Sequence, residues 1–265
     1  MQITSTLQRL RSQPIRQRYY QAVNAMLVPV AGRALGISHV VEYPKCGGSW
    51  VRRMLETYLH AAPYHHDRYI SRNTVIQLHR LYSSRLCNPI VLYRDPRDVF
   101  VSYYFYERNQ ALRGTHLAIT GHFDFSEQDS VRGAFGRYLR AKLSAQTDPY
   151  FSYREFHESW SHCARKCVVT YEGFHRDAVG ELGSAVEFLG LRPDPERIDH
   201  AVAYNTFEQV TRRKYGEDRG KGVEDNSKFQ RKGVTGDWVN YFDDESSALI
   251  ERELGDMMKA LGYQW

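Results

Sequence analysis

The sequence predicts a single α/β domain in which a central parallel sheet is flanked by helices. Short apolar, β-like runs alternate with stretches of helical periodicity along the chain, and this alternation is typical of a parallel sheet covered on both faces. The length of 265 residues suits one such domain. We therefore expect a basic N-terminal helical segment, residues 1–36, followed by one domain, residues 37–265.

Two periodicities locate the predicted elements. Apolar β-like runs occur at residues 40–43, 74–78, 90–93 and 168–171. Helical spacing of apolar residues occurs at 50–59, 97–108, 132–145, 154–164, 178–189 and 245–261. Pro96 suits the first turn of the second of these helices. Residues 107–130 are polar and aperiodic, so we expect a functional lid that contacts the substrate, or a disordered loop.

The link between the first strand and the first helix reads Tyr-Pro-Lys-Cys-Gly-Gly-Ser-Trp over residues 43–50. A strand, a glycine turn and a helix start form an anion site, because free amides and the positive end of the helix point at the ligand. Gly47 and Gly48 allow close approach of the backbone, Lys45 adds charge, and Ser49 is a candidate cap or direct donor. The lysine precedes the glycines, so this is not a Walker A loop. Taken alone, it could be only a tight connection.

The loop resembles the phosphosulfate-binding loop of the sulfotransferases that use 3′-phosphoadenosine 5′-phosphosulfate (PAPS), whose usual form is Tyr-Pro-Lys-Ser-Gly-Thr-Thr-Trp. The resemblance implies that the loop from Lys45 to Ser49 holds the 5′-phosphosulfate and that Trp50 contacts the purine. Cys46 and Gly48 stand where the family has Ser and Thr. One hydroxyl donor is therefore missing, and the backbone must do more of the binding.

A second motif, residues 88–104, is a short strand, an Arg-Asp-Pro turn and a helix. Arg94 is expected at the carboxyl end of its strand, where open α/β sheets bind ligands, and a guanidinium there can hold a phosphate through two hydrogen bonds. A surface ion pair with Asp98 is the alternative. The family reads Arg-Asn-Pro-Lys-Asp and then Val-Ser-Tyr-Tyr, and the resemblance assigns the 3′-phosphate contacts to Arg94 and Ser102.

A third motif, residues 229–242, contains Arg-Lys-Gly and then Gly-Asp-Trp. It is similar to the family's closing loop, Arg-Lys-Gly-x-x-Gly-Asp-Trp. The resemblance implies that Arg231, Lys232 and Gly233 also contact the 3′-phosphate. Three motifs in the family's order imply a P-loop-like α/β fold and a PAPS-dependent sulfotransferase.

Two shorter matches concern the adenine of PAPS. Residues 168–172 resemble the strand whose tyrosine faces the adenine, which points to Tyr171. Residues 204–207 resemble the segment whose aromatic side chain covers the purine, which points to Thr206 and Phe207. Trp50 and Phe207 would then sandwich the base.

The transfer of a sulfuryl group to a hydroxyl needs a base, cations on the leaving phosphate and in-line positioning. His79 follows the second predicted strand and resembles the histidine of the family's Lys-Thr-His motif, which implies that it is the base, with Lys45 as a catalytic cation. Gln77 replaces the lysine of that motif, so a second catalytic cation is missing from its usual place. His65 and His66 are rivals for the base.

The net charge of +5 is small and unevenly distributed. The first 41 residues hold five arginines and no acid, and residues 212–232 hold eight cations and four anions. A cationic flap suits a ligand with several phosphate and sulfate charges, whereas nucleic acid would need a continuous basic face. We expect a cytoplasmic protein whose N-terminus makes at most weak contact with an anionic membrane surface; an organelle transit segment is the alternative.

The four cysteines, Cys46, Cys87, Cys163 and Cys167, show no paired spacing and are expected to be free thiols in a reducing compartment. Cys163, Cys167 and His162 could be zinc ligands, but core packing is favoured because there is no second pair. No metal is expected.

The favoured activity is transfer of the sulfuryl group of PAPS to an acceptor hydroxyl, with release of adenosine 3′,5′-bisphosphate. Polar residues 107–130 favour a carbohydrate or glycolipid over a small alcohol or phenol, while aromatics at 103–106, Phe123 and Phe125 suit a sugar or a phenol. The alternatives are a nucleotide kinase or NTPase, which the loop order disfavours, and a catalytically inactive PAPS-binding module, hinted at by Gln77 and Gly48. Nothing in the sequence indicates the oligomeric state.

Overall fold

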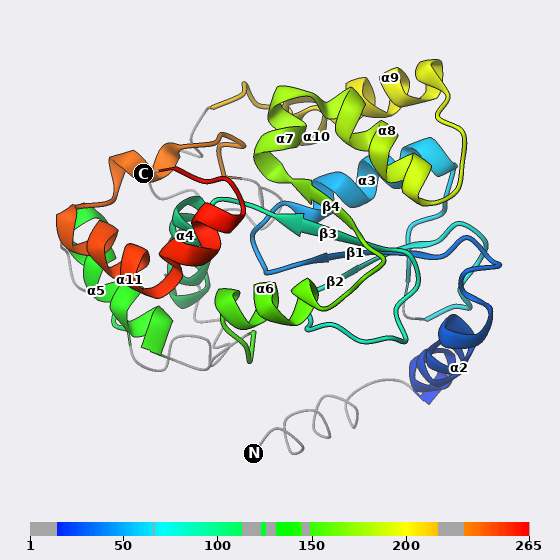
Figure 1. Ribbon diagram of the computed structural model, residues 1–265, viewed down its shortest axis with the longest axis horizontal. Coiled ribbons are helices and arrows are strands. Elements are labelled where there is room, and N and C mark those ends of the chain that lie inside the picture. The colour runs from blue at the N-terminus through cyan, green and yellow to red at the C-terminus, as the bar shows by residue number, and fades with distance from the viewer. Residues whose placement is uncertain are drawn as a thin grey trace.

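The centre of the molecule is a four-stranded parallel sheet (Figure 1). The computed structural model describes residues 15–65, 67–112, 123–125, 131–144, 149–216 and 231–264. The strands are β1 (Ser38–Glu42), β2 (Val75–Leu78), β3 (Pro89–Tyr93) and β4 (Cys167–Thr170), in the order β2-β1-β3-β4 with every neighbouring pair parallel. The two central strands, β1 and β3, are buried along their whole length. The predicted parallel α/β architecture is confirmed.

Helices cover both faces of the sheet. Figure 1 shows α3, α7, α8 and α9 on one face, α6 on the other, and α4, α5 and α11 gathered beyond the carboxyl ends of the strands. The helices are α2 (Ile15–Ala31), α3 (Gly48–Leu59), α4 (Pro96–Leu112), α5 (Val131–Ser144), α6 (Tyr153–Ser161), α7 (Tyr171–Arg176), α8 (Ala178–Phe188), α9 (Pro195–Tyr204), α10 (Phe207–Thr211), the 3₁₀ helix η1 (Asp237–Asn240) and α11 (Asp244–Ala260).

Capping side chains explain where several helices begin. Ser152 and Glu155 form a capping box at α6, and Asp243 accepts the Ser246 amide at α11. Thr170 accepts the Gly173 amide and starts α7. The fourth strand therefore ends one residue before its predicted end, and Tyr171 is helical. Helices α7, α9 and α10 are short, and sequence periodicity did not predict them.

The main hydrophobic core joins the sheet to the helices on both of its faces. A smaller cluster links Val28 of α2 to Ile37, Ile76 and Cys87. Residues 15–31 therefore form a helix that packs on the domain; residues 1–14 of the predicted N-terminal segment lie outside the described part of the chain. Among the described helices, none combines the length and the apolar composition that a membrane span requires.

The segment predicted as a lid is described only in part. Its first residues continue α4, where the buried Glu107 accepts a hydrogen bond from the Tyr138 hydroxyl and pairs with Lys142, each at 2.7 Å. Phe123 and Phe125 pack on Tyr138 at the core. These residues do not form a lid; residues 113–122 and 126–130 lie outside the described part of the chain.

Candidate active site

The chain changes direction in the sheet between β1 and β3. It leaves β1 towards β2 and leaves β3 towards β4, on the opposite side. Open α/β sheets bind ligands in the crevice at such a switch point, outside the carboxyl ends of the strands. A cleft of about 640 Å³ opens there, which is in the size range of ligand pockets.

The turn after β1 approaches its neighbours closely. Gly47 is the N-cap of α3 with φ 102°, a conformation that favours glycine, and it makes no side-chain cap. A Cβ atom there would lie 2.6 Å from the ring of Tyr171. Ser49 does not cap the helix: it lies inside α3, and its hydroxyl donates to the Gln77 Oε1 atom at 3.1 Å. The cap role expected for Ser49 is therefore wrong.

A buried carboxylate lies directly beneath the anion loop. Glu42 accepts the Gly48 amide at 2.5 Å and the Gln77 side-chain amide at 2.6 Å. Burial raises the pKa of Glu42, and nearby His79 and these two donors oppose the rise. A Cβ atom on Gly48 would lie 2.3 Å from the carboxylate. Glu42 therefore both requires glycine at position 48 and occupies an amide that was expected to bind the ligand.

His79 lies just after β2 and lines the cleft. Its Nδ1 atom is 3.3 Å from the Glu42 backbone oxygen and 3.8 Å from the Glu42 carboxylate. In the neutral ring, an Nδ1–H facing this carbonyl leaves the lone pair on Nε2. His65 is not among the residues that line the cleft, and His66 lies outside the described residues. Of His79 and His65, the two candidates that the structure describes, His79 is therefore the one on the cleft.

Arg94 follows β3 and lies almost buried at the floor of the cleft. Its guanidinium donates to the backbone oxygens of Lys45 and Val234 at 3.2 and 3.1 Å and lies 4.2 Å above the Tyr171 ring. Asp98 is 4.0 Å away and has no exposed side-chain surface, so the alternative of a surface pair is wrong. The buried Nε atom has no hydrogen-bond partner in the described part of the chain, and Ser102 of α4 lines the same cleft.

The closing loop is tied to helix α4 and to itself. Asp98 accepts the amides of Gly236 and Trp238 at 2.6 and 2.9 Å. Arg231 and Lys232 both pair with Asp237, at 2.5 and 3.1 Å. Asp98 of the second motif thus holds the third motif beside the cleft, although the two motifs are far apart in the sequence. The third motif brings two cations, Arg231 and Lys232, to the cleft.

The other end of the cleft is aromatic. The Trp50 indole donates to the Asn205 oxygen at 2.8 Å, and its ring lies 5.7 Å from Tyr171. Phe207 packs against Gly233, where a Cβ atom would lie 2.5 Å from its ring. The hydroxyl of Thr206 accepts the Gln209 amide and caps α10. A flat, π-rich surface of this kind suits a purine.

All the predicted site residues except Cys46 fall on this one surface. The predicted residues that line the cleft are Lys45, Gly47, Gly48, Ser49, Trp50, His79, Arg94, Ser102, Tyr171, Thr206, Phe207, Arg231, Lys232 and Gly233. The Cys46 thiol is instead buried and 3.7 Å from the Tyr153 hydroxyl. The Cys46 thiol is therefore not available to a ligand in the cleft.

Sequence reasoning missed Arg53 and His175, which also line the cleft. Burial lowers the pKa of His175 to about 4, with a smaller effect in the same direction from Arg94, so this ring is neutral at pH 7. No local pattern marks these residues, because their exposure to the cleft depends on packing between distant segments.

Within the described ranges, no group of three or more His, Cys, Asp or Glu side chains is arranged to hold a metal ion. The zinc alternative for Cys163 and Cys167 therefore has no support from the geometry. The described cysteines are all unpaired thiols.

Comparisons with known proteins agree with this fold and cleft. The family model described as the sulfotransferase domain matches residues 56–262, and the chain therefore belongs to the sulfotransferase domain family, whose fold is of the P-loop-like α/β type. The matched residues begin after the anion loop at 43–50, so that loop is evidence beyond the match.

Relatives and solved structures are similar at low identity. Sulfotransferase 2A6 of Mus musculus is 27% identical over 64% of this chain and 55% of its own length. Sulfotransferase 1E1 of Cavia porcellus is 26% identical over 67% and 57%. The chain thus spans little more than half the length of these relatives. A crystal structure of mouse sulfotransferase SULT7A1 complexed with PAP has a TM-score of 0.61 at 19% identity, with 89% of each chain covered. At this identity the likeness concerns the fold alone.

Proposed function

We propose that this protein transfers the sulfuryl group of PAPS to an acceptor hydroxyl and releases adenosine 3′,5′-bisphosphate (PAP). The observation that carries the proposal is the convergence of three sequence motifs, spread from residue 43 to residue 242, on one cleft at the switch point of the sheet. Family membership supports it, as does the PAP bound to the structurally similar mouse SULT7A1.

The residues present fit the charges of PAPS. Arg94, Arg231 and Lys232 gather at one side of the cleft and suit the 3′-phosphate. The Arg94 guanidinium, which lines the cleft, can donate to it. Lys45 and the start of α3 suit the 5′-phosphosulfate. Trp50 and Phe207 are proposed to enclose the adenine.

The reaction needs one proton transfer and one bond exchange. As the acceptor oxygen bonds to sulfur, the bond between sulfur and the bridging oxygen of the 5′-phosphate breaks, and its electron pair stays on PAP. The acceptor proton passes to His79 Nε2, whose lone pair the Nδ1 contact with Glu42 leaves available. Lys45 offsets the charge that develops on the leaving phosphate.

For the acceptor, we propose a polar hydroxyl, on a saccharide ahead of a small phenol. The support is the set of polar groups at the catalytic end of the cleft, namely Lys45, Gln77 and His79, beside Tyr103 and Tyr106. Saccharides bind through hydrogen bonds and aromatic faces, whereas a small apolar acceptor prefers a mostly apolar pocket.

One assay tests both parts of the proposal. Radiolabelled PAPS and radiolabelled ATP are each offered with a panel of neutral saccharides, glycolipids and simple phenols. We expect label transfer from PAPS and none from ATP, with saccharides preferred. Transfer from ATP would support a nucleotide kinase, and tight PAP binding without transfer to any acceptor would support an inactive binding module. Rapid sulfation of phenols with no glycan product would overturn the acceptor proposal alone.

A further inference from the structure

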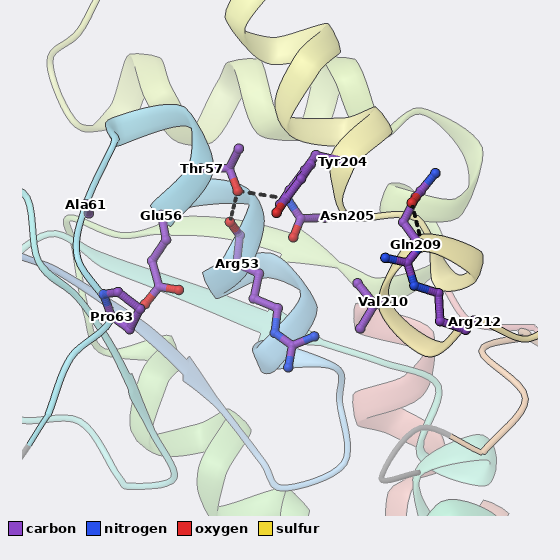
Figure 2. A pocket seen from close by; sticks show the side chains of 10 residues that line it. All are labelled: Arg53, Glu56, Thr57, Ala61, Pro63, Tyr204, Asn205, Gln209, Val210 and Arg212. Atoms are coloured by element: carbon purple, nitrogen blue, oxygen red, sulfur yellow. Dashed lines mark hydrogen bonds between the residues drawn. The ribbon is translucent and has the colours of Figure 1, made fainter. Parts of the chain in front are cut away.

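Arg53 lies between the cleft and a second cavity. It belongs to α3, one turn after Ser49, and lines both the cleft and a side pocket of about 400 Å³ between α3 and α10. Figure 2 shows its side chain extending from α3 into the space between Glu56 and Val210. The two cavities share Arg53, Asn205 and Val210, so the arginine stands at their common wall.

The charge of Arg53 is not neutralised by a contacting acid. Its side chain makes no hydrogen bond or ion pair with another residue that the structure describes. Burial raises the pKa of the nearby Glu56 and Arg53 opposes this rise, but the Glu56 carboxylate is held by Arg52 at 2.5 Å. Other cleft cations differ in this respect, because Arg231 and Lys232 share Asp237. Arg53 is therefore available to an anionic ligand.

The anion loop has already used several of its donors. The Ser49 hydroxyl donates to Gln77, and the Gly48 amide donates to Glu42. The Glu42 carboxylate, when ionised, also adds a negative charge beneath the loop. A phosphosulfate bound there would therefore need additional cations beyond Lys45.

The direction of the side chain suits this need. Side chains on a helix lean towards its N-terminus and cover the preceding turn. The turn before Arg53 contains Ser49 and Trp50, which line the cleft at the start of α3. A long guanidinium side chain at position 53 can therefore reach the space in front of the anion loop.

We propose that Arg53 binds the sulfuryl end of PAPS and so makes this site favour PAPS over PAP. The inference rests on the proposed function. It assigns to Arg53 a charge-assisted contact with the sulfuryl group, which PAP lacks, rather than with the phosphates that the two nucleotides share. Arg53 then binds its ligand in the cleft, and the adjacent side pocket has no part in this role.

Calorimetry without acceptor tests the assignment, using PAPS and PAP as the two ligands. Loss of one charge-assisted contact should weaken PAPS binding by roughly tenfold to a hundredfold. Arg53→Gln should therefore weaken PAPS by that factor and change PAP by less than about threefold. Arg53→Lys, which keeps the charge, should recover part of the loss.

Arg72→Gln is the matched control. It removes the same charge from an exposed turn, and Arg72 lines neither cavity. The ratio of PAPS to PAP affinity should stay at the wild-type value in this variant, and thermal unfolding should show that both variants fold.

Each contrary result has a distinct meaning. Equal weakening of both nucleotides by Arg53→Gln would place Arg53 on a part that they share, and no change in either would assign it to the side pocket. A shifted ratio in Arg72→Gln would show a general field effect. Each of these would overturn the inference while leaving the proposed function standing, whereas failure of the wild type to bind either nucleotide would overturn the proposed function itself.

Discussion

Glu42 accepts hydrogen bonds from the anion loop and from the neighbouring strand β2. Its two carboxylate oxygens take the Gly48 amide and the Gln77 amide, and Gln77 in turn accepts from Ser49. Two of the departures from the family pattern, at Gly48 and Gln77, are thus parts of one hydrogen-bonded network. A larger residue at position 48 has no room, because the acid fills the space that its side chain would need.

Gly48→Ala should destabilise the protein by about 1–3 kcal/mol, because the new methyl group would overlap the Glu42 carboxylate. Urea unfolding measures the change. Gly183→Ala in α8 is the control, since a Cβ atom there meets only Ile198 at 3.7 Å. That substitution should stabilise by roughly 0.5–1 kcal/mol, because alanine is the better helix former. Equal effects at the two sites would contradict the steric role of Glu42.

His79→Ala should lower turnover by roughly 10² to 10⁴, the usual contribution of a general base. PAP affinity should be unchanged, because the imidazole is expected to contact the acceptor and not the nucleotide. Steady-state rates together with calorimetry measure the two quantities. His65→Ala is the control and should retain activity. If His65→Ala were inactive and His79→Ala active, His79 would not be the base.

At the scale of elements, the closing loop is held by one carboxylate. Asp237 opens η1 and binds Arg231 and Lys232 from the preceding segment. Burial acts to raise the pKa of Asp237, but the two cations outweigh it and the pKa lies below its usual value. The loop that brings the third motif to the cleft is therefore electrostatically anchored.

This anchoring predicts a pH dependence of stability. Because the folded pKa of Asp237 is lowered, its stabilising contribution is fully present above the unfolded value of about 3.9 and is lost as the pH falls through the folded value. Asp237→Asn should unfold at a lower temperature than the wild type at pH 7, and the gap should narrow below about pH 4. Thermal unfolding at pH 3 to 7 measures it. A gap that is constant with pH would show that charge is not the cause.

At the scale of the whole molecule, ligand binding should stabilise the fold, because the cleft joins β1, β3, α3, α7 and the closing loop. A ligand that binds only the folded state adds about 2.7 kcal/mol at a hundredfold excess over its Kd. PAP should therefore raise the unfolding temperature by several degrees. Adenosine 5′-monophosphate at the same concentration is the control for the 3′-phosphate, and an equal shift with it would contradict the role proposed for Arg94.

The architecture could be predicted from local sequence features, and most of the cleft from the resemblance to the sulfotransferase family. Alternating β-like and helical periods indicate a parallel sheet, and the carboxyl ends of its strands meet at one edge. Residues that follow strands, such as Lys45, His79 and Arg94, therefore converge wherever the loops are short. Ser102, Phe207 and Arg231 do not follow strands, and only the family resemblance predicted that they belong to the same site.

The remaining features depend on which distant side chains pack together. The Gly48 amide is occupied by Glu42 of β1, and the Cys46 thiol is buried against Tyr153 of α6. Arg53 has no ion-pair partner among the described residues, because Glu56 pairs with Arg52. The low pKa of His175 likewise arises from burial in the folded cleft. Local periodicity carries no information on such contacts, because burial and hydrogen-bond partners are set only when separate elements come into contact.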